Sequence, residues 1–173
     1  MPSTDANTAV EHIRRERPAV IDHVLKYAGT DLLCYRAEEP AELRDRQHDA
    51  WQPLLDWAAD TFGARLKVTD SVVPVEQPDD AFSRLRTAVE ALDDPSLTAL
   101  AAVTGASGSL IVGLALVHGH IGAEAAFEAS QLDERWQSEK WGEDEEEIKR
   151  RDEIKDEIAA AAGIMGLEAR KKD

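Results

Sequence analysis

Apolar residues recur at helical spacing along most of the chain. In the segment 18–29, for example, Ile21, Val24 and Leu25 fall on one face, and Gly29 suits the position just after a helix end. Pro53 is expected to kink or split the helix that contains it. The pattern is typical of a mainly α fold, a multi-helix and bundle-like domain. The same spacing predicts further helices over residues 8–16, 38–63, 79–92, 93–103, 108–119, 123–142 and 143–166.

Two short segments have β-strand character instead. They are "TDLLCYR", residues 30–36, and "RLKVTDSVVPV", residues 65–75. Because two strands alone are only marginally stable, these segments are expected to pair and pack on helices, or to form the edge of a larger sheet. The expected fold is therefore a helical domain with a small two-strand element at about 30–36 and 65–75.

A long stretch without Asp, Glu, Lys or Arg runs from Ser96 to Ala123. A membrane-spanning helix needs about 20 consecutive, mostly apolar residues. Here "TGASGS", residues 104–109, interrupts the stretch with small and polar residues. We therefore expect two buried helices joined by a Gly/Ser turn, and no insertion into a membrane.

These elements suggest that the chain divides near residue 78. Residues 1–78 hold helices and the two strands, and residues 79–167 form a C-terminal helical domain. The charged tail, residues 168–173, is expected to fray.

The net charge of the chain limits the classes of partner that it is expected to bind. With 35 acidic and 20 basic side chains, its formal net charge is −15. Such a chain repels phosphate backbones and anionic lipids, so we expect neither nucleic acid nor a membrane surface as a partner. A basic protein partner fits better. A single cysteine, Cys34, excludes a disulfide framework and fits a reducing compartment.

The motifs that could support catalysis are incomplete. "GASGS", residues 105–109, lacks the Lys-Ser/Thr ending of a phosphate loop and the glycine spacing of a nucleophile elbow. His118 and His120 could supply two metal ligands, but no second ligand cluster accompanies them, so a polar helix-end turn is expected. Cys34 is expected to be an inert buried thiol. We predict no enzymatic activity, no cofactor and no metal.

Two tryptophans lie in the most charged segment, "QLDERWQSEKWGEDEEE". Trp136 is expected in the core, and Trp141 is expected to pack between the last two helices. The two lie about 140° apart around a helix, so they cannot share one narrow groove unless the helix ends between them. The alternative is that both are aromatic anchors within the charged rim of an interface. Asp133 and Glu134 are expected to point outward, as solvated charges or as partner contacts.

Several stretches together resemble a known family. They are "ANTAVEHI", "GTDLLCYRAEEPAEL", "QHDAWQPLLDWAADTFG" and "LDERWQSEKWGEDEE", which occur in this order over nearly the whole chain. The chain is similar in these stretches to the chaperones that assemble F-type ATP synthase through its alpha subunit, the Atp-twelve family. The resemblance also implies a β-rich domain ahead of the "ANTA" helix, with the two strands at the junction to it.

The resemblance implies a function and a site. A member of this family would bind the unassembled alpha subunit, prevent its aggregation and promote assembly of the catalytic head. It would act in the cytoplasm of a bacterium or the mitochondrial matrix of a eukaryote. An acidic position before "WG" is thought to matter, which maps first to Asp133 and then to Glu134. The expected partner-binding residues are Asp133, Glu134, Gln137, Trp136 and Trp141.

Two other classes of function stay open at this point. One is an enzyme with an unrecognised carboxylate or histidine site, which would need a deep pocket with two or more convergent groups of shifted pKa. The other is a plain dimerisation module, and self-association into a homodimer is left open under either reading.

Overall fold

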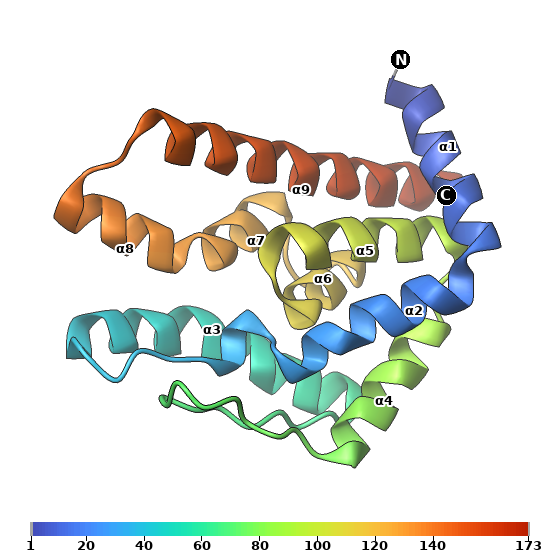
Figure 1. Cartoon of the computed structure of the whole chain (residues 1–173). Helices are drawn as coiled ribbons and strands as arrows, with labels where there is room; N and C mark the ends of the chain where they lie inside the picture. Colours follow the sequence, from blue (N-terminus) through green and yellow to red (C-terminus); the bar gives the residue numbers. More distant parts are fainter. Residues whose placement is uncertain (1, 173) are drawn as a thin grey trace.

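The computed structural model describes the backbone of residues 2–172 and the side chains of residues 8–166. Within these residues the chain is mainly helical, as predicted (Figure 1). Among the described residues, no helix combines the length and the apolar character that a membrane span requires. The helices are α1 (Pro2–Arg15), α2 (Arg17–Lys26), α3 (Ala41–Phe62), α4 (Asp79–Glu90), α5 (Asp94–Ser107), α6 (Leu110–Val117), α7 (Ala123–Ser130), α8 (Leu132–Trp141) and α9 (Glu145–Lys172), with short 3₁₀ turns η1 (Tyr27–Gly29) and η2 (Leu32–Cys34).

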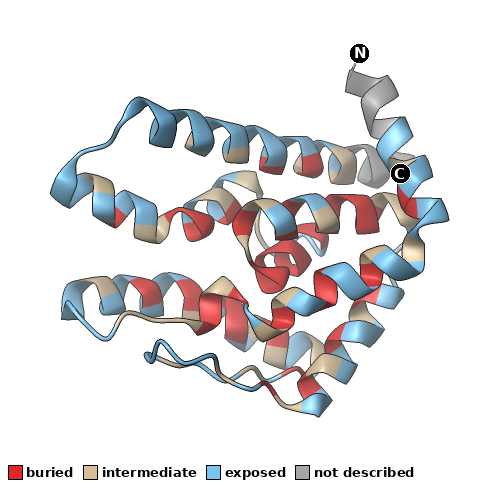
Figure 2. Cartoon of the chain, in the orientation of Figure 1, coloured by how far each residue is buried: buried red, intermediate tan, exposed pale blue. Residues whose placement is uncertain are grey.

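The centre of the molecule is the pair α5 and α6, which the charge-free stretch forms. Every residue of α6 is buried, and α5 packs against α1, α2, α6, α7 and α9 (Figure 2). The two helices approach closely at Gly113, because a Cβ atom there would lie 2.7 Å from Thr104 Oγ1. The predicted pair of buried helices is confirmed.

The Gly/Ser turn between these helices is built by local caps. Gly108 ends α5 with φ of 77°, a left-handed conformation that favours glycine. Ser109 is the N-cap of α6, and its Oγ accepts a hydrogen bond of 3.0 Å from the Val112 backbone N–H. The motif "GASGS" is therefore a helix-joining turn, as expected.

The predicted two-strand element is wrong. The segments 30–36 and 65–75 do lie side by side, but they share a single parallel bridge, between Tyr35 and Thr69. In the first segment the Asp31 side chain accepts from Leu33 N–H and folds residues 32–34 into a 3₁₀ turn. In the second, the Gln77 side chain takes the place of a partner strand. Its Oε1 accepts from Lys67 N–H at 2.7 Å, and its Nε2 donates to Lys67 O at 2.9 Å.

Two expectations about the helices need comment. Pro53 lies inside α3 on its exposed side and does not split the helix, so the expected split is wrong and the expected kink stays a prediction. The long helix predicted over residues 123–142 breaks at Gln131, so that α7 and α8 are separate helices.

The predicted domain boundary after residue 78 stays a prediction. The expected fraying of residues 168–173 also stays one. The backbone is helical to Lys172, and the side chains after residue 166 lie outside the described residues.

Candidate functional site

Helix α8 carries all five predicted partner-binding residues, and its geometry divides them between two sides. Asp133, Trp136 and Lys140 follow a spacing of three and four residues and form one stripe, which faces α3. A second stripe lies roughly 120° round the helix; its members are Glu134, Gln137, Ser138 and Trp141. We call these the α3-facing stripe and the outer stripe.

Trp136 anchors the α3-facing stripe. The residue is only 7% exposed, which confirms the core expectation. Two cations lie against its ring, with Arg46 Cζ 4.9 Å and Lys140 Nζ 4.7 Å from the ring centroid. Arg46 also forms an ion pair of 2.9 Å with Glu139. This indole therefore ties α8 to α3.

Asp133 belongs to the same contact and does not point freely outward. Its Oδ1 accepts a hydrogen bond of 2.7 Å from Gln47 Nε2 of α3. Gln47 is buried, and its Oε1 accepts a 2.7 Å hydrogen bond from Ala37 N–H. Burial raises the pKa of the Asp133 carboxyl, and the Gln47 hydrogen bond partly offsets this. The expectation that Asp133 is held outward is corrected, because an amide far away in sequence binds it.

Glu134 lies on the outer stripe and faces a cleft. Loss of water against the cleft walls raises the pKa of its carboxyl, and the charge of Asp133 adds to this. A hydrogen bond from its own backbone and the charge of Arg150 act in the opposite direction. Among the described residues, no basic side chain lies within ion-pair distance of this carboxylate.

Trp141 is 82% exposed at the end of α8. The expectation that it packs between the last two helices is therefore wrong. Gly142, with φ of 77° and ψ of 178°, turns the chain away into α9 and leaves the indole in solvent. An exposed indole beside an acidic surface matches the composition of an interface anchor.

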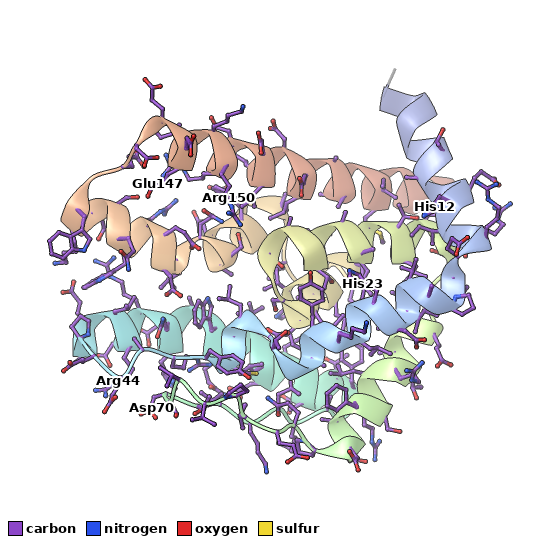
Figure 3. All side chains as sticks on the ribbon, in the orientation of Figure 1. His12, His23, Arg44, Asp70, Glu147 and Arg150 are labelled. Carbon is purple, nitrogen blue, oxygen red and sulfur yellow. The ribbon has the colours of Figure 1, made fainter. Side chains whose placement is uncertain are left out.

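The cleft beside the outer stripe has a volume of about 360 Å³. Its walls are α8 and the first turns of α9, and the end of α5 closes its floor. Figure 3 shows Glu147 and Arg150 of α9 lying between the two helices. The residues that line it are Leu32, Gly105, Ala106, Ser107, Gly108, Ser130, Gln131, Glu134, Gln137, Ser138, Glu147, Arg150, Arg151 and Ile154.

The other chemical candidates are accounted for by packing. His118 and His120 sit in the turn after α6, where the His120 ring stacks on Trp57 at 4.9 Å between ring centroids. Burial lowers the pKa of His118. Cys34 is buried, and loss of water raises the pKa of its thiol to about 12, which fits an inert thiol. Among the described side chains no three potential metal ligands gather in one place.

Sequence reasoning missed the residues that hold the site together. Gln47 and Arg46 are polar positions of a long helix, and no local pattern distinguishes them from solvated ones. Arg150 belongs to a helix whose charged residues match the spacing of i,i+4 ion pairs along its own surface. The roles of Gln47 and Arg46 come from contacts with α8, which is about 90 residues from α3 along the chain.

Three comparisons with known proteins agree with one another. Residues 1–59 match the family model described as ATP12 chaperone protein. The mitochondrial protein atp12 of Schizosaccharomyces pombe is 25% identical over 157 residues, which cover 86% of this chain and 54% of that protein. The chain thus spans about half the length of this curated relative.

Solved structures extend the likeness to almost the whole chain. The crystal structure of Atp12 from Paracoccus denitrificans is 39% identical, with a TM-score of 0.92 over 96% of this chain and 72% of that one. A candidate chaperone from Agrobacterium tumefaciens is 37% identical, with a TM-score of 0.86 over 96% of this chain and 63% of that one. Sequence and structure together therefore show that this chain belongs to the ATP12 chaperone family.

Proposed function

We propose that this protein is a chaperone of F-type ATP synthase assembly that binds the unassembled alpha subunit. It prevents aggregation of that subunit and promotes assembly of the catalytic head. The observation that carries this proposal is the match over 96% of the chain to a solved Atp12 structure. The absence of three convergent metal ligands within the described residues and the inert Cys34 are compatible with a binding protein.

The five residues of α8 contribute in two ways under this proposal. Glu134, Gln137 and Trp141 contact the client, because the outer stripe is accessible. Asp133 and Trp136 act mainly by holding α8 against α3, and with it the orientation of the outer stripe. A lost Asp133 therefore weakens client binding through the position of α8.

The enzyme alternative gains no support from this geometry. It requires two convergent groups of shifted pKa in one deep pocket. Asp133 and Glu134 both have raised pKa values, but they face different sides of α8. A non-enzymatic binding role accounts better for the arrangement.

Light scattering tests the proposal directly. Purified alpha subunit is warmed until it aggregates, alone, with this chain, and with an unrelated acidic protein of similar size. We expect this chain to suppress the scattering in proportion to its concentration and to bind alpha in sedimentation. If the chain neither binds alpha nor slows its aggregation, the proposal is wrong.

A further inference from the structure

The cleft between α8 and α9 contains hydrogen-bond acceptors that nothing in the described structure engages. The Glu134 carboxylate has no ion-pair partner there. Two carbonyl groups in the last turn of α5, those of Gly105 and Ala106, accept no backbone hydrogen bond within the described residues, because the Ser109 N–H donates to Ser107 Oγ and the Leu110 N–H to Asp31. The final carbonyl oxygens of a helix carry its partial negative charge and favour a cation.

The charges of the cleft leave a negative balance. Arg151 is engaged by Glu143 at 2.7 Å, so that pair is neutral. Of the remaining lining side chains, Glu134 and Glu147 oppose Arg150 alone. With the negative end of α5 at the floor, the cleft favours an incoming cation over an incoming anion.

Trp141 adds an apolar contact on the same stripe. It lies seven residues after Glu134, so the two are about 10 Å apart along the helix axis. Its exposure of 82% leaves the indole free to pack against a partner. A ligand that contacts both Glu134 and Trp141 would present a cation and an apolar side chain about 10 Å apart, the rise of two turns of a helix.

We infer that the α8–α9 cleft is the client-docking site and receives a lysine or arginine side chain, while an apolar residue of the client about two helical turns away packs on Trp141. The inference rests on the function proposed above and names the chemistry of the client segment. The cation pairs with the Glu134 carboxylate and meets the carbonyl groups in the last turn of α5.

Charge reversal at Glu134 tests the cleft. The affinity of the full chain for purified alpha subunit is measured for the unaltered protein, Glu134→Gln and Glu134→Lys. Asp60→Lys is the matched control, because Asp60 is an exposed acid near the end of α3, away from α8. We expect Glu134→Lys to weaken binding about tenfold or more, Glu134→Gln to weaken it less, and the control to stay near the unaltered value.

A crosslink identifies the client segment. A photoreactive residue at position 137 is crosslinked to alpha, and the attached peptide is sequenced. We expect a lysine or arginine next to the crosslink, whose reversal to glutamate restores binding to the Glu134→Lys chain. Circular dichroism and thermal melting verify that every variant is folded.

The outcomes separate the two proposals. If the unaltered chain binds alpha and Glu134→Lys binds as well as Asp60→Lys, the cleft inference is overturned while the proposed function stands. A crosslinked segment without a basic residue, or no rescue by the reversed pair, overturns it too. If the unaltered chain does not bind alpha at all, the proposed function fails and the inference fails with it.

Discussion

A buried carboxylate, Asp31, joins two distant parts of the chain. It is 0% exposed, and its oxygens accept from Ser109 Oγ at 2.7 Å and from the backbone N–H groups of Ile111 and Leu33 at 3.1 Å. Burial is the main cause that raises the pKa of Asp31 to about 6, and hydrogen bonds from Ser109 Oγ and from three backbone N–H groups limit the rise. This residue stabilises the start of α6 and the turn before Tyr35 together.

The raised pKa of Asp31 predicts a pH dependence of stability. The folded state binds the proton more tightly than the unfolded state, whose aspartate has a pKa near 3.8. The stabilisation from this proton is therefore fully present below about pH 4 and is lost as the pH rises through about 6. We expect the free energy of unfolding, measured in urea, to fall over this window relative to Asp31→Asn, by up to about 3 kcal/mol. Parallel pH profiles of the two proteins would contradict the assignment.

Substitutions of the two tryptophans of α8 are expected to differ in their effect on stability. Trp136→Ala removes a buried ring and its two cation contacts, so we expect the free energy of unfolding to drop by about 3 kcal/mol or more. Trp141→Ala removes an exposed ring, so a change below about 0.5 kcal/mol is expected, with a loss of alpha binding. Urea denaturation followed by circular dichroism measures the first quantity and sedimentation with alpha the second. Similar destabilisation by both changes would show that Trp141 is packed after all.

At the scale of the element, α8 packs against α3 on one side and lines the cleft on another. Its α3-facing stripe is held by the hydrogen bond from the buried Gln47 amide and by Arg46 of α3 on the Trp136 indole. Of its outer stripe, Glu134, Gln137 and Ser138 line the cleft opposite α9. One short helix thus separates the residues that set its position from those that a client can reach.

This division predicts different consequences for neighbouring acids. Asp133→Lys removes the hydrogen bond from Gln47 and places a cation beside its amide donors. We therefore expect the free energy of unfolding to fall by about 1–3 kcal/mol. Glu134→Lys should change it by less than about 0.5 kcal/mol. Thermal melting of both variants against the unaltered chain checks the difference. Equal melting temperatures for the two would refute the role of Asp133 in holding α8 against α3.

At the scale of the whole molecule, the candidate surface lies at one edge and meets the buried centre at the end of α5. The buried pair α5 and α6 occupies the centre, and α8 with the start of α9 forms a largely exposed corner (Figure 2). The start of α9 is acidic, with Glu145, Glu146 and Glu147 in its first turn. The corner that we propose for the client is therefore acidic, like the chain as a whole, whose net charge is −15.

The acidic surface predicts that association with alpha depends on salt. Opposite charges steer two proteins together, and dissolved ions screen that attraction. We expect the association rate constant to fall about tenfold as salt rises from roughly 0.05 to 0.5 M, while the dissociation rate changes less. Stopped-flow or surface-based kinetics measure both rates. An association rate that does not change with salt would show that charge plays no part in the encounter.

Much of the architecture follows from the sequence alone, for local reasons. Helical spacing of apolar residues and the small, polar residues of "TGASGS" act within a few residues, so they predict most helices and the turn correctly. The lack of charge from Ser96 to Ala123 predicts the buried centre for the same reason. The ordered stretches that resemble the chaperone family also agree with the family to which the chain belongs.

Only the tertiary structure decided how the candidate site is built. Gln47 and Asp133 are 86 residues apart, and Gln77 replaces a strand partner ten residues away, contacts that no local pattern encodes. These contacts half-buried Asp133 and turned the expected strands into a turn and an extended loop. The chain by itself therefore determined which residues lie in helices and in the core. The packing of α3, α5, α8 and α9 determined which acids of α8 face a client, because that depends on partners distant in sequence.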